Sequence, residues 1–353
     1  MSDIQNNFDP SPRRVKRRAL KVTLIALLVL VLISAGVLYT YYQRYQSAIS
    51  GLPSGAPVTL TIASGDSYSQ LGDQLVSKGI TSSKTFYSLY LKLNPPPVLL
   101  PGLYTMHRNE SLKDVFSTLK KGPNEFKVTV IPGMTLKQIA AVVGNIPGHS
   151  SANFLAALKA GGYSSPFITP STPSLEGLLA PETYFILPSE SDSSVIQEMI
   201  NQTTANAQSA GLLPSTKVNG LDAYQILTVA SLIQREALLY SDYPKVARVI
   251  YNRLALPMNL QFDSTVLYGL GLTSGSPTLS QLKIATPYNT YLNAGLPPTP
   301  ISAPSPDAIR AALNPEPGPW IYFVTVQSNG LEAFSTTYAE QLANEQLAAS
   351  RGL

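Results

Sequence analysis

The feature that most constrains this chain is an uncharged stretch of 22 residues, Val22 to Gln43 (VTLIALLVLVLISAGVLYTYYQ). As a helix it would extend about 33 Å, enough to cross a hydrocarbon core of ~30 Å. Tyr39, Tyr41 and Tyr42 lie at its far end, where interfacial aromatic residues are common. The stretch exceeds the ~7–15 apolar residues of a cleaved signal peptide, and no clear A-x-A cleavage site follows. We therefore expect an uncleaved transmembrane helix over residues 22–43.

Basic side chains gather in residues 1–21, before this stretch. They are Arg13, Arg14, Lys16, Arg17, Arg18 and Lys21, against the acidic Asp3 and Asp9. The positive-inside rule places this tail in the cytoplasm and the rest of the chain outside. The chain has 25 Lys and Arg against 21 Asp and Glu, so removing the tail's six and two leaves 19 of each. Residues 22–353 therefore carry no net charge, and we do not expect a basic groove that binds nucleic acid.

Residue usage excludes several kinds of chemistry. The sequence has no cysteine and only two histidines, His107 and His149, neither within a motif. Thiol nucleophiles, thiolate-bound zinc, iron–sulfur clusters and disulfides are therefore excluded. We therefore expect any catalysis to depend on carboxylates.

The remaining chain divides into a linker over residues 44–57, a small mixed module over 58–146 and a larger domain over 147–353. Within the module over residues 58–146, a strand, a turn and a capped helix occur twice, 68 positions apart. Gly65, Ser67 and Leu71 correspond to Gly133, Thr135 and Ile139. In both copies the glycine relaxes the turn and the hydroxyl residue caps the helix. The repeat predicts architecture and carries no chemistry.

An amphipathic helix is predicted over residues 221–239. Val229, Leu232 and Ile233 belong to its apolar stripe, and Glu236 follows them by seven, four and three residues. The carboxyl of Glu236 therefore falls on the apolar face. Burial there would raise its pKa, as a general acid near neutral pH requires. The alternative is a glutamate at the edge of the stripe whose head reaches water, and periodicity leaves both open.

Segments rich in amides, hydroxyls and tyrosines follow this helix, at residues 251–254, 258–271, 286–291 and 295–301. Amides and hydroxyls bind sugar hydroxyl groups, and aromatic rings cover the apolar faces of sugars. The same residue types are also ordinary turn formers. Composition alone favours the turn interpretation over a sugar-binding cleft.

Several ordered motifs resemble the YceG-like, or MltG, family of membrane-anchored endolytic murein lytic transglycosylases. They are ASLIQRE (230–236), VIYNRL (249–254), LQFDSTVLYGLG (260–271), TPYNTY (286–291) and GLPPTPI (295–301), with LEGLLAPETY (175–184) and WIYFV (320–324) as further segments. The resemblance implies an α+β fold with a single N-terminal transmembrane helix. It also implies a LysM-like α/β module over residues 58–146 and a mixed α+β catalytic domain over residues 147–353.

The resemblance also implies the site and the reaction. The family's catalytic glutamate falls on Glu236, and the matching motifs supply expected substrate-binding residues: Glu176, Asn252, Arg253, Gln261, Asp263, Thr265, Tyr268, Tyr288, Asn289, Thr290 and Tyr291. The implied reaction cleaves the β-1,4 bond between N-acetylmuramic acid and N-acetylglucosamine within a glycan strand. It closes a 1,6-anhydro ring on the muramyl residue. It needs no metal or organic cofactor.

Three positions depart from the family pattern. Gln234 stands where a further glutamate is usual, Ser264 replaces the proline of an Asp-Pro pair, and Glu332 stands in a segment that commonly holds a histidine. Two alternatives therefore stay open. One is a lysozyme-like hydrolase that uses Glu236 and Asp263. The other is a non-catalytic peptidoglycan-binding anchor that scaffolds cell-wall synthases.

The implied location is the bacterial plasma (inner) membrane, with one span, a cytoplasmic N-terminus and an extracytoplasmic catalytic domain. The expected partners are peptidoglycan glycan strands, the membrane through residues 22–43, and peptidoglycan synthases (penicillin-binding proteins). Anchored there, the protein would terminate the elongation of nascent strands. No nucleic acid is expected as a partner.

Overall fold

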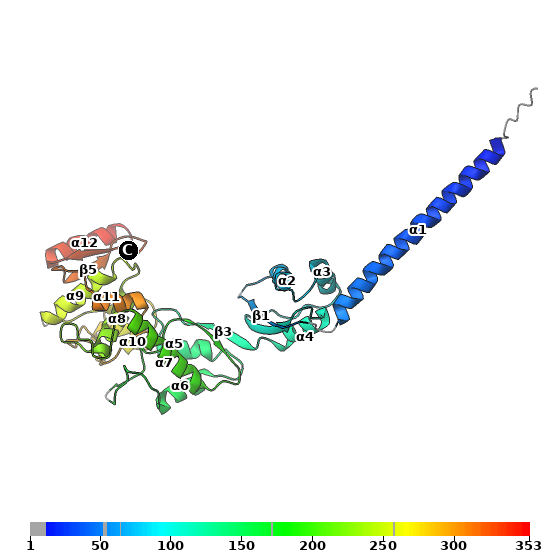
Figure 1. Ribbon diagram of the computed structural model, residues 1–353. Coiled ribbons are helices and arrows are strands. Elements are labelled where there is room, and N and C mark those ends of the chain that lie inside the picture. Colours follow the sequence, from blue (N-terminus) through cyan, green and yellow to red (C-terminus); the bar gives the residue numbers. More distant parts are fainter. Residues whose placement is uncertain (1–11, 52–54, 64, 171, 257) are drawn as a thin grey trace, which may run out of the picture. The chain divides into compact units, whose positions relative to one another are not determined.

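The computed structural model describes residues 12–51, 55–63, 65–170, 172–256 and 258–353. The chain forms two compact units, one up to Asn124 and one from Glu125 to Leu353 (Figure 1). Residues 1–11 of the predicted basic tail lie outside the described residues. The mixture of helices and strands confirms the expected α+β class.

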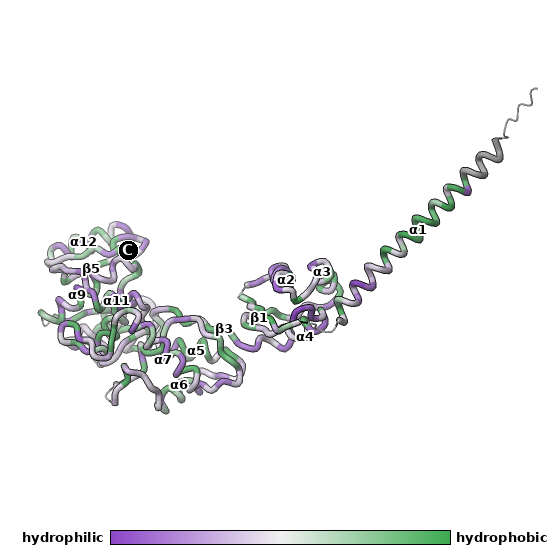
Figure 2. Tube along the Cα trace, in the orientation of Figure 1, coloured by the Kyte–Doolittle hydropathy of each residue, from purple (hydrophilic) through white to green (hydrophobic). Residues whose placement is uncertain are grey.

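The predicted membrane helix lies within α1 (Pro12–Ser50). Its segment Leu20–Ser50 is long and apolar enough to cross a membrane, and its large apolar side chains from Leu20 to Leu38 are exposed. Figure 2 shows this part of the helix as largely hydrophobic. The helix runs past the expected end at Gln43. Tyr41 and Tyr45 each pack on the ring of Phe86, at 5.2 and 5.8 Å between centroids. These contacts connect the end of α1 to the module that follows it.

After α1, the first unit holds a strand pair and three helices: β1 (Pro57–Ile62), α2 (Tyr68–Ser77), α3 (Lys84–Leu93), β2 (Gly102–His107) and α4 (Leu112–Lys121). β1 and β2 are antiparallel, with Leu60 opposite Tyr104. Both of these side chains are fully buried, as is Leu71 of α2. The alternation of the strands and the apolar face of α2 thus form one small core.

The two-copy repeat is confirmed as architecture. β1 leads into α2, and β3 (Glu125–Thr129) leads into α5 (Leu136–Val143). Gly65 and Gly133 both have φ +87°, a conformation that glycine adopts without strain. Ser67 and Thr135 cap the two helices, and in each a glutamine at the third helical position reaches back to the cap.

The second unit holds the remaining elements: α6 (Ser151–Ala160), β4 (Thr183–Ile186), α7 (Asp192–Ser209), α8 (Ala223–Glu236), α9 (Tyr243–Ala255), α10 (Asp263–Gly269), the 3-10 turn η1 (Gln281–Lys283), α11 (Pro306–Leu313), β5 (Tyr322–Thr325), β6 (Glu332–Ser335) and α12 (Tyr338–Ser350). β3 pairs with β4, and β5 pairs with β6, both antiparallel. The expected division at 146/147 stays a prediction. Ile139 and Val143, which precede it, share a core with Val195 of α7, which follows it.

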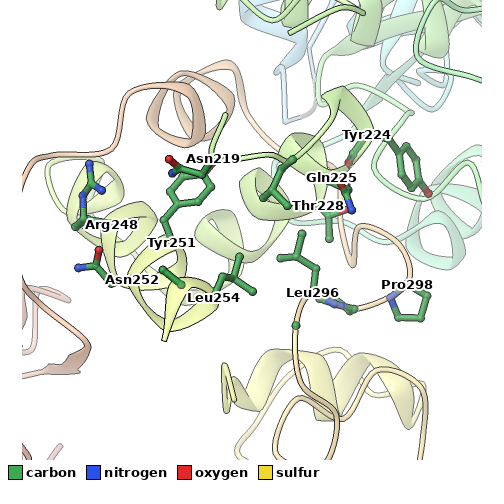
Figure 3. A pocket seen from close by; sticks show the side chains of 14 residues that line it. Asn219, Tyr224, Gln225, Thr228, Arg248, Tyr251, Asn252, Leu254, Leu296 and Pro298 are labelled. Atoms are coloured by element: carbon green, nitrogen blue, oxygen red, sulfur yellow. Dashed lines mark hydrogen bonds between the residues drawn. The ribbon is translucent and has the colours of Figure 1, made fainter. Parts of the chain in front are cut away.

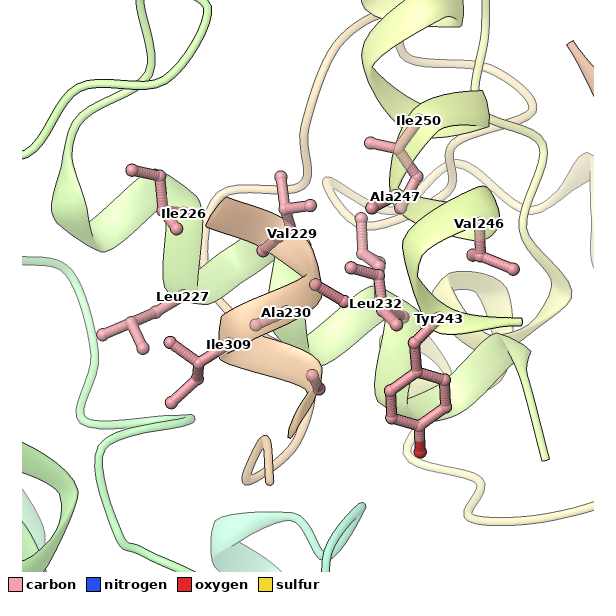
Figure 4. Close-up of a cluster of buried hydrophobic side chains, with 14 of the residues drawn as sticks. Ile226, Leu227, Val229, Ala230, Leu232, Tyr243, Val246, Ala247, Ile250 and Ile309 are labelled. Atoms are coloured by element: carbon pink, nitrogen blue, oxygen red, sulfur yellow. The ribbon is translucent and has the colours of Figure 1, made fainter. Parts of the chain in front are cut away.

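The main core of this unit lies between α8, α9 and α11. Figure 4 shows side chains of the three helices pointing toward one another, among them Leu232, Ile250 and Ile309. All three are at most 1% exposed. This packing fixes the position of α8, on which the candidate residue Glu236 lies.

α8 ends earlier than its periodicity predicts. Asp222 caps its start in a capping box, and Glu236 is its last residue. Ala237 is extended (φ −109°, ψ 138°), so the expected continuation to residue 239 is wrong. The chain reverses there so that α9 can begin at Tyr243 and pack back on α8. Glu236 therefore stands at a helix end, where its carboxyl can meet groups from other segments.

Candidate active site

Glu236, the last residue of α8, follows fully buried residues of the same helix. Leu232 and Ile233, on the preceding turn of α8, are fully buried, whereas Glu236 is intermediate in exposure. Its Oε1 accepts a hydrogen bond from the hydroxyl of Ser264, on the first turn of α10. The predicted apolar-face position is thus confirmed, and the carboxyl also has a hydroxyl partner.

The surroundings favour a protonated Glu236. Desolvation raises the pKa of Glu236 to about 7, helped by the charges of Asp263 and Glu332. The Ser264 hydrogen bond and the charge of Arg235 oppose this rise in pKa. A carboxyl that is half-protonated near neutral pH can both donate and accept a proton.

Asp263 lies beside this carboxyl and is held by Tyr291. The Tyr291 hydroxyl donates to Asp263 Oδ1 at 2.7 Å. The loop that carries Tyr291 is fixed by the buried Asn289, whose amide donates to the carbonyls of Leu282 and Ile284 at 2.9 and 2.8 Å. Asn289 Oδ1 accepts the backbone N–H of Tyr291 at 3.0 Å. Asn289 is thus a loop support, and Tyr291 is the part of this motif that reaches the site.

Thr265 and Thr290 join α10 to the same loop. Their hydroxyls are 2.8 Å apart and both residues are buried. The Thr290 hydroxyl also accepts the backbone N–H of Phe262 at 2.9 Å. Gln261, just before, is exposed and has φ +53°, a left-handed conformation that non-glycine residues rarely adopt. The threonines therefore hold a constrained turn at the start of α10.

Arg253 and Asn252 support the site from α9. The buried Arg253 donates from Nε to the carbonyl of Ile321 at 2.6 Å and also to the carbonyl of Leu260. Its charge and that of Glu236 attract each other. Asn252 donates to the carbonyls of Gly318 and Trp320, at 3.0 and 2.8 Å. Both side chains fasten the segment before β5 to α9.

Glu176, Tyr268 and Tyr288 form a separate cluster. Glu176 is 3% exposed and accepts the backbone N–H of Leu136 at 3.0 Å and the Tyr268 hydroxyl at 2.9 Å. Tyr268 and Tyr288 pack edge to face, with centroids 4.8 Å apart. These contacts connect the start of α5 to α10. The structure thus divides the predicted residues between the surroundings of Glu236 and this buried connection.

A cavity of about 840 Å³ lies at another part of the unit (Figure 3). Its lining includes Tyr224, Gln225 and Thr228 of α8, Asn252 of α9 and Leu296. Thr228 precedes Glu236 by eight residues, about 12 Å along the helix. Because no carboxyl group lines this cavity, we place the candidate chemistry at Glu236 instead.

The sequence does not indicate the contacts of Ser264 and Glu332, which differ from the family motif. Ser264 donates a hydrogen bond to Glu236, and the charge of Glu332 raises the pKa of Glu236. Ser264 and Glu236 are 28 positions apart, and no local pattern indicates their contact. Among the described residues, no group of three His, Asp or Glu side chains is placed to hold a metal ion.

The fold and the site together define a candidate acid–base centre made of carboxyl groups, in which the pKa of Glu236 is raised to about 7 and the second carboxyl, of Asp263, lies near it. The model of the YceG-like family matches residues 60–347, which is most of the chain. The chain belongs to the YceG-like family.

Similar proteins agree with this assignment. An endolytic murein transglycosylase of Bacillus subtilis (strain 168) is 32% identical over 307 residues, covering 81% of this chain and 83% of that protein. One of Streptococcus pneumoniae (strain R6) is 31% identical over 344 residues, covering 88% of this chain and 62% of the longer relative. The crystal structure of a YceG-like protein from Listeria monocytogenes matches with a TM-score of 0.61 and 30% identity, over 81% of this chain and 98% of that one.

Proposed function

We propose that this protein is a membrane-anchored endolytic peptidoglycan lytic transglycosylase. It cleaves the β-1,4 bond between N-acetylmuramic acid and N-acetylglucosamine within glycan strands and leaves 1,6-anhydro-N-acetylmuramic acid ends. The observation that carries the proposal is the carboxyl of Glu236, with a pKa raised to about 7 at the end of a packed helix. The relatives named endolytic murein transglycosylases supply the substrate class.

In the first step Glu236 acts as the general acid. Its proton goes to the glycosidic oxygen as the bond from that oxygen to C1 of the muramyl residue breaks. Positive charge develops at C1 and the ring oxygen. Asp263, which is held by Tyr291, is the nearby carboxylate that stabilises this charge.

In the second step the Glu236 carboxylate acts as the base. It takes the proton of the muramyl 6-hydroxyl while that oxygen bonds to C1 and closes the anhydro ring. No water is added, and Glu236 regains the proton that it gave in the first step. One carboxyl thus serves both steps, and the Ser264 hydroxyl stabilises it while it is ionised.

The membrane helix limits where the enzyme works. α1 tethers the domains to the outer face of the plasma membrane, with the basic tail in the cytoplasm. Nascent glycan emerges at that surface from membrane-bound synthases, which we propose as partners. Cleavage there terminates strand elongation, and the LysM-like module over residues 58–146 positions the strand.

A hydrolase is the second candidate, favoured by Asp263 as a second carboxylate near Glu236. Glu236 would remain the acid, but water would attack C1 and yield a reducing end. Asp263 would then be indispensable, whereas the transglycosylase needs it only for charge stabilisation.

Mass spectrometry of glycan products tests the proposal. The full chain in detergent micelles is incubated with uncrosslinked peptidoglycan, beside Glu236→Gln and the charge-matched control Glu345→Gln, an exposed position on α12. We expect anhydro ends from wild type and from Glu345→Gln, and none from Glu236→Gln. Reducing ends would identify a hydrolase. Binding without cleavage by the folded wild type would identify a scaffold.

A further inference from the structure

Glu332 is a buried acid that the proposed mechanism does not use. It lies on β6 opposite Thr325 of β5 and is 8% exposed. Its Oε1 accepts the Thr325 hydroxyl at 2.8 Å, while its buried Oε2 has no hydrogen-bond partner among the described residues. An ionised oxygen left unpaired in this way is costly, whereas a protonated one costs much less.

The β5–β6 hairpin places Glu332 against the segments that surround Glu236. The backbone N–H of Glu332 donates at 3.0 Å to Asp242, in the turn between α8 and α9. Gly330, at the hairpin turn, leaves no room for a side chain, because a Cβ there would lie 2.6 Å from Leu238. The hairpin thus packs on the six residues that follow Glu236.

The same hairpin also contacts the start of α10. The Phe323 ring of β5 lies 6.0 Å from that of Phe262, the residue just before Asp263. Phe323 and Phe334 also pack against the main core that holds α8 and α9. Glu332 is therefore fixed relative to both carboxyl groups of the candidate site.

We propose that Glu332 is a positioning residue for Glu236: a second buried acid whose charge makes Glu236 hold its catalytic proton to higher pH. The inference rests on the proposed role of Glu236 as general acid. It gives Glu332 no contact with substrate.

Charges of both signs surround the two acids. Burial raises the pKa of Glu332 to about 7; Thr325 opposes the rise, and the charge of Asp242 adds to it. On α9, the ammonium of Lys245 lies 5.5 Å from the Phe334 ring centre, two residues along β6. Around Glu236 itself, Asp263 and Glu332 raise its pKa, whereas Arg235 and the Ser264 hydroxyl lower it.

Two interacting acids with similar pKa values lose their protons in two separate steps. One proton leaves first, and the charge that it leaves behind delays the second ionisation. Glu236 thus loses its proton over a broader pH range than a lone acid would. Activity that requires protonated Glu236 then declines gradually on the alkaline side.

The test is the pH–rate profile of the full chain in detergent micelles. Glu332→Gln keeps the size of the side chain and an oxygen for Thr325 but has no charge. At alkaline pH the rate declines, and we call this part of the profile the alkaline limb. In Glu332→Gln we expect the midpoint of this limb to fall by roughly half a pH unit. We also expect the limb to become as steep as the loss of a single proton predicts. Glu332→Asp, which restores a carboxyl, should recover part of the shift, and Glu345→Gln should show none.

Thr325→Val gives a second route to the same result. It removes the hydrogen bond that favours ionised Glu332, so Glu332 stays neutral over more of the pH range. The alkaline midpoint should again fall, by less than in Glu332→Gln. An equal loss of activity at every pH in Glu332→Gln, with the limb unmoved, would mean a purely structural role and overturn the inference.

A titration separates this inference from the proposed function. The carboxyl of Glu236 is followed by NMR in chains labelled at glutamate side-chain carbons, with Glu236→Gln identifying its signal. A lower pKa of Glu236 in Glu332→Gln supports the coupling even if wild type cleaves no glycan. An unchanged pKa of Glu236 in the folded variant contradicts the coupling even if the enzyme is active.

Discussion

At the scale of single residues, the proposed chemistry depends on opposing influences on the pKa of one carboxyl, that of Glu236. Desolvation and the charges of Asp263 and Glu332 raise the pKa of Glu236, and Ser264 lowers it by donating a hydrogen bond. A group that must first give and then take a proton benefits from this balance, because neither protonation state is strongly favoured near neutral pH.

Removing the Ser264 hydroxyl should shift this balance toward the protonated form. In Ser264→Ala the carboxylate loses its donor, so the pKa of Glu236 rises and the alkaline limb moves up by about one pH unit. At pH values below this limb the rate should fall, because the Glu236 carboxylate, the base of the second step, loses the hydrogen bond that orients it. Ser264→Thr, which keeps a hydroxyl, is the matched control in the pH–rate measurement. A limb that moves down in Ser264→Ala would contradict the assigned role.

Sequence periodicity could predict Glu236 but not its partners. The stripe of α8 places the residue on the apolar face, and the structure confirms that position. The contacts of Glu236 with Ser264 and of Tyr291 with Asp263 each join residues 28 positions apart, on different segments of the chain. Packing of distant segments decides such contacts, and it leaves no local signal.

At the scale of elements, buried polar connections hold the helices that carry the site. Glu176 joins the first turn of α5 to α10 through Leu136 and Tyr268. The family resemblance predicts Glu176 as a substrate-binding residue because a matching motif contains it. The structure places it in the interior, with its oxygens already bound to protein groups.

Glu176 should make stability depend on pH. Burial raises its pKa in the folded chain to about 7, from an ordinary value of 4.5. The protonated side chain therefore favours folding fully below pH 4.5, and this contribution is lost as pH rises through 7. It amounts to on the order of 3 kcal/mol. Thermal unfolding of the full chain should thus occur at lower temperature at pH 8 than at pH 5.

Glu176→Gln removes this titration. The difference in unfolding temperature between the two pH values should become smaller in the variant than in wild type. Glu345→Gln, at an exposed position, should leave the difference unchanged. An identical pH dependence in wild type and Glu176→Gln would show that Glu176 is not protonated in the folded chain.

At the scale of the whole molecule, the sequence predicts order and class better than boundaries. The apolar helix, the repeated strand–turn–helix and the α+β character follow from periodicity and caps, and all are present. The end of α8 at Glu236 could not be predicted from periodicity, because the reversal into α9 depends on packing between the two helices. Helix ends are set by such contacts as much as by local sequence.

The proposed membrane attachment through α1 gives a prediction for the intact protein. Arginine in place of Leu27 and Leu30 costs about 2.5–3.5 kcal/mol per residue at the centre of a span. The doubly substituted chain should therefore leave the membrane fraction in an alkaline carbonate wash. Leu93→Arg, at an exposed apolar position of α3, is the control and should stay in the membrane fraction. Retention of the doubly substituted chain would argue against α1 as the anchor.

The central claim is that Glu236 closes an anhydro ring without adding water, and the most direct measurement is cleavage in water labelled with heavy oxygen. The full chain in detergent micelles is incubated with uncrosslinked glycan strands, and the mass of the new muramyl ends is determined. The account predicts unlabelled ends, one water lighter than reducing ends, that disappear in Glu236→Gln. New ends that carry the heavy oxygen would contradict it, because water would then have attacked C1.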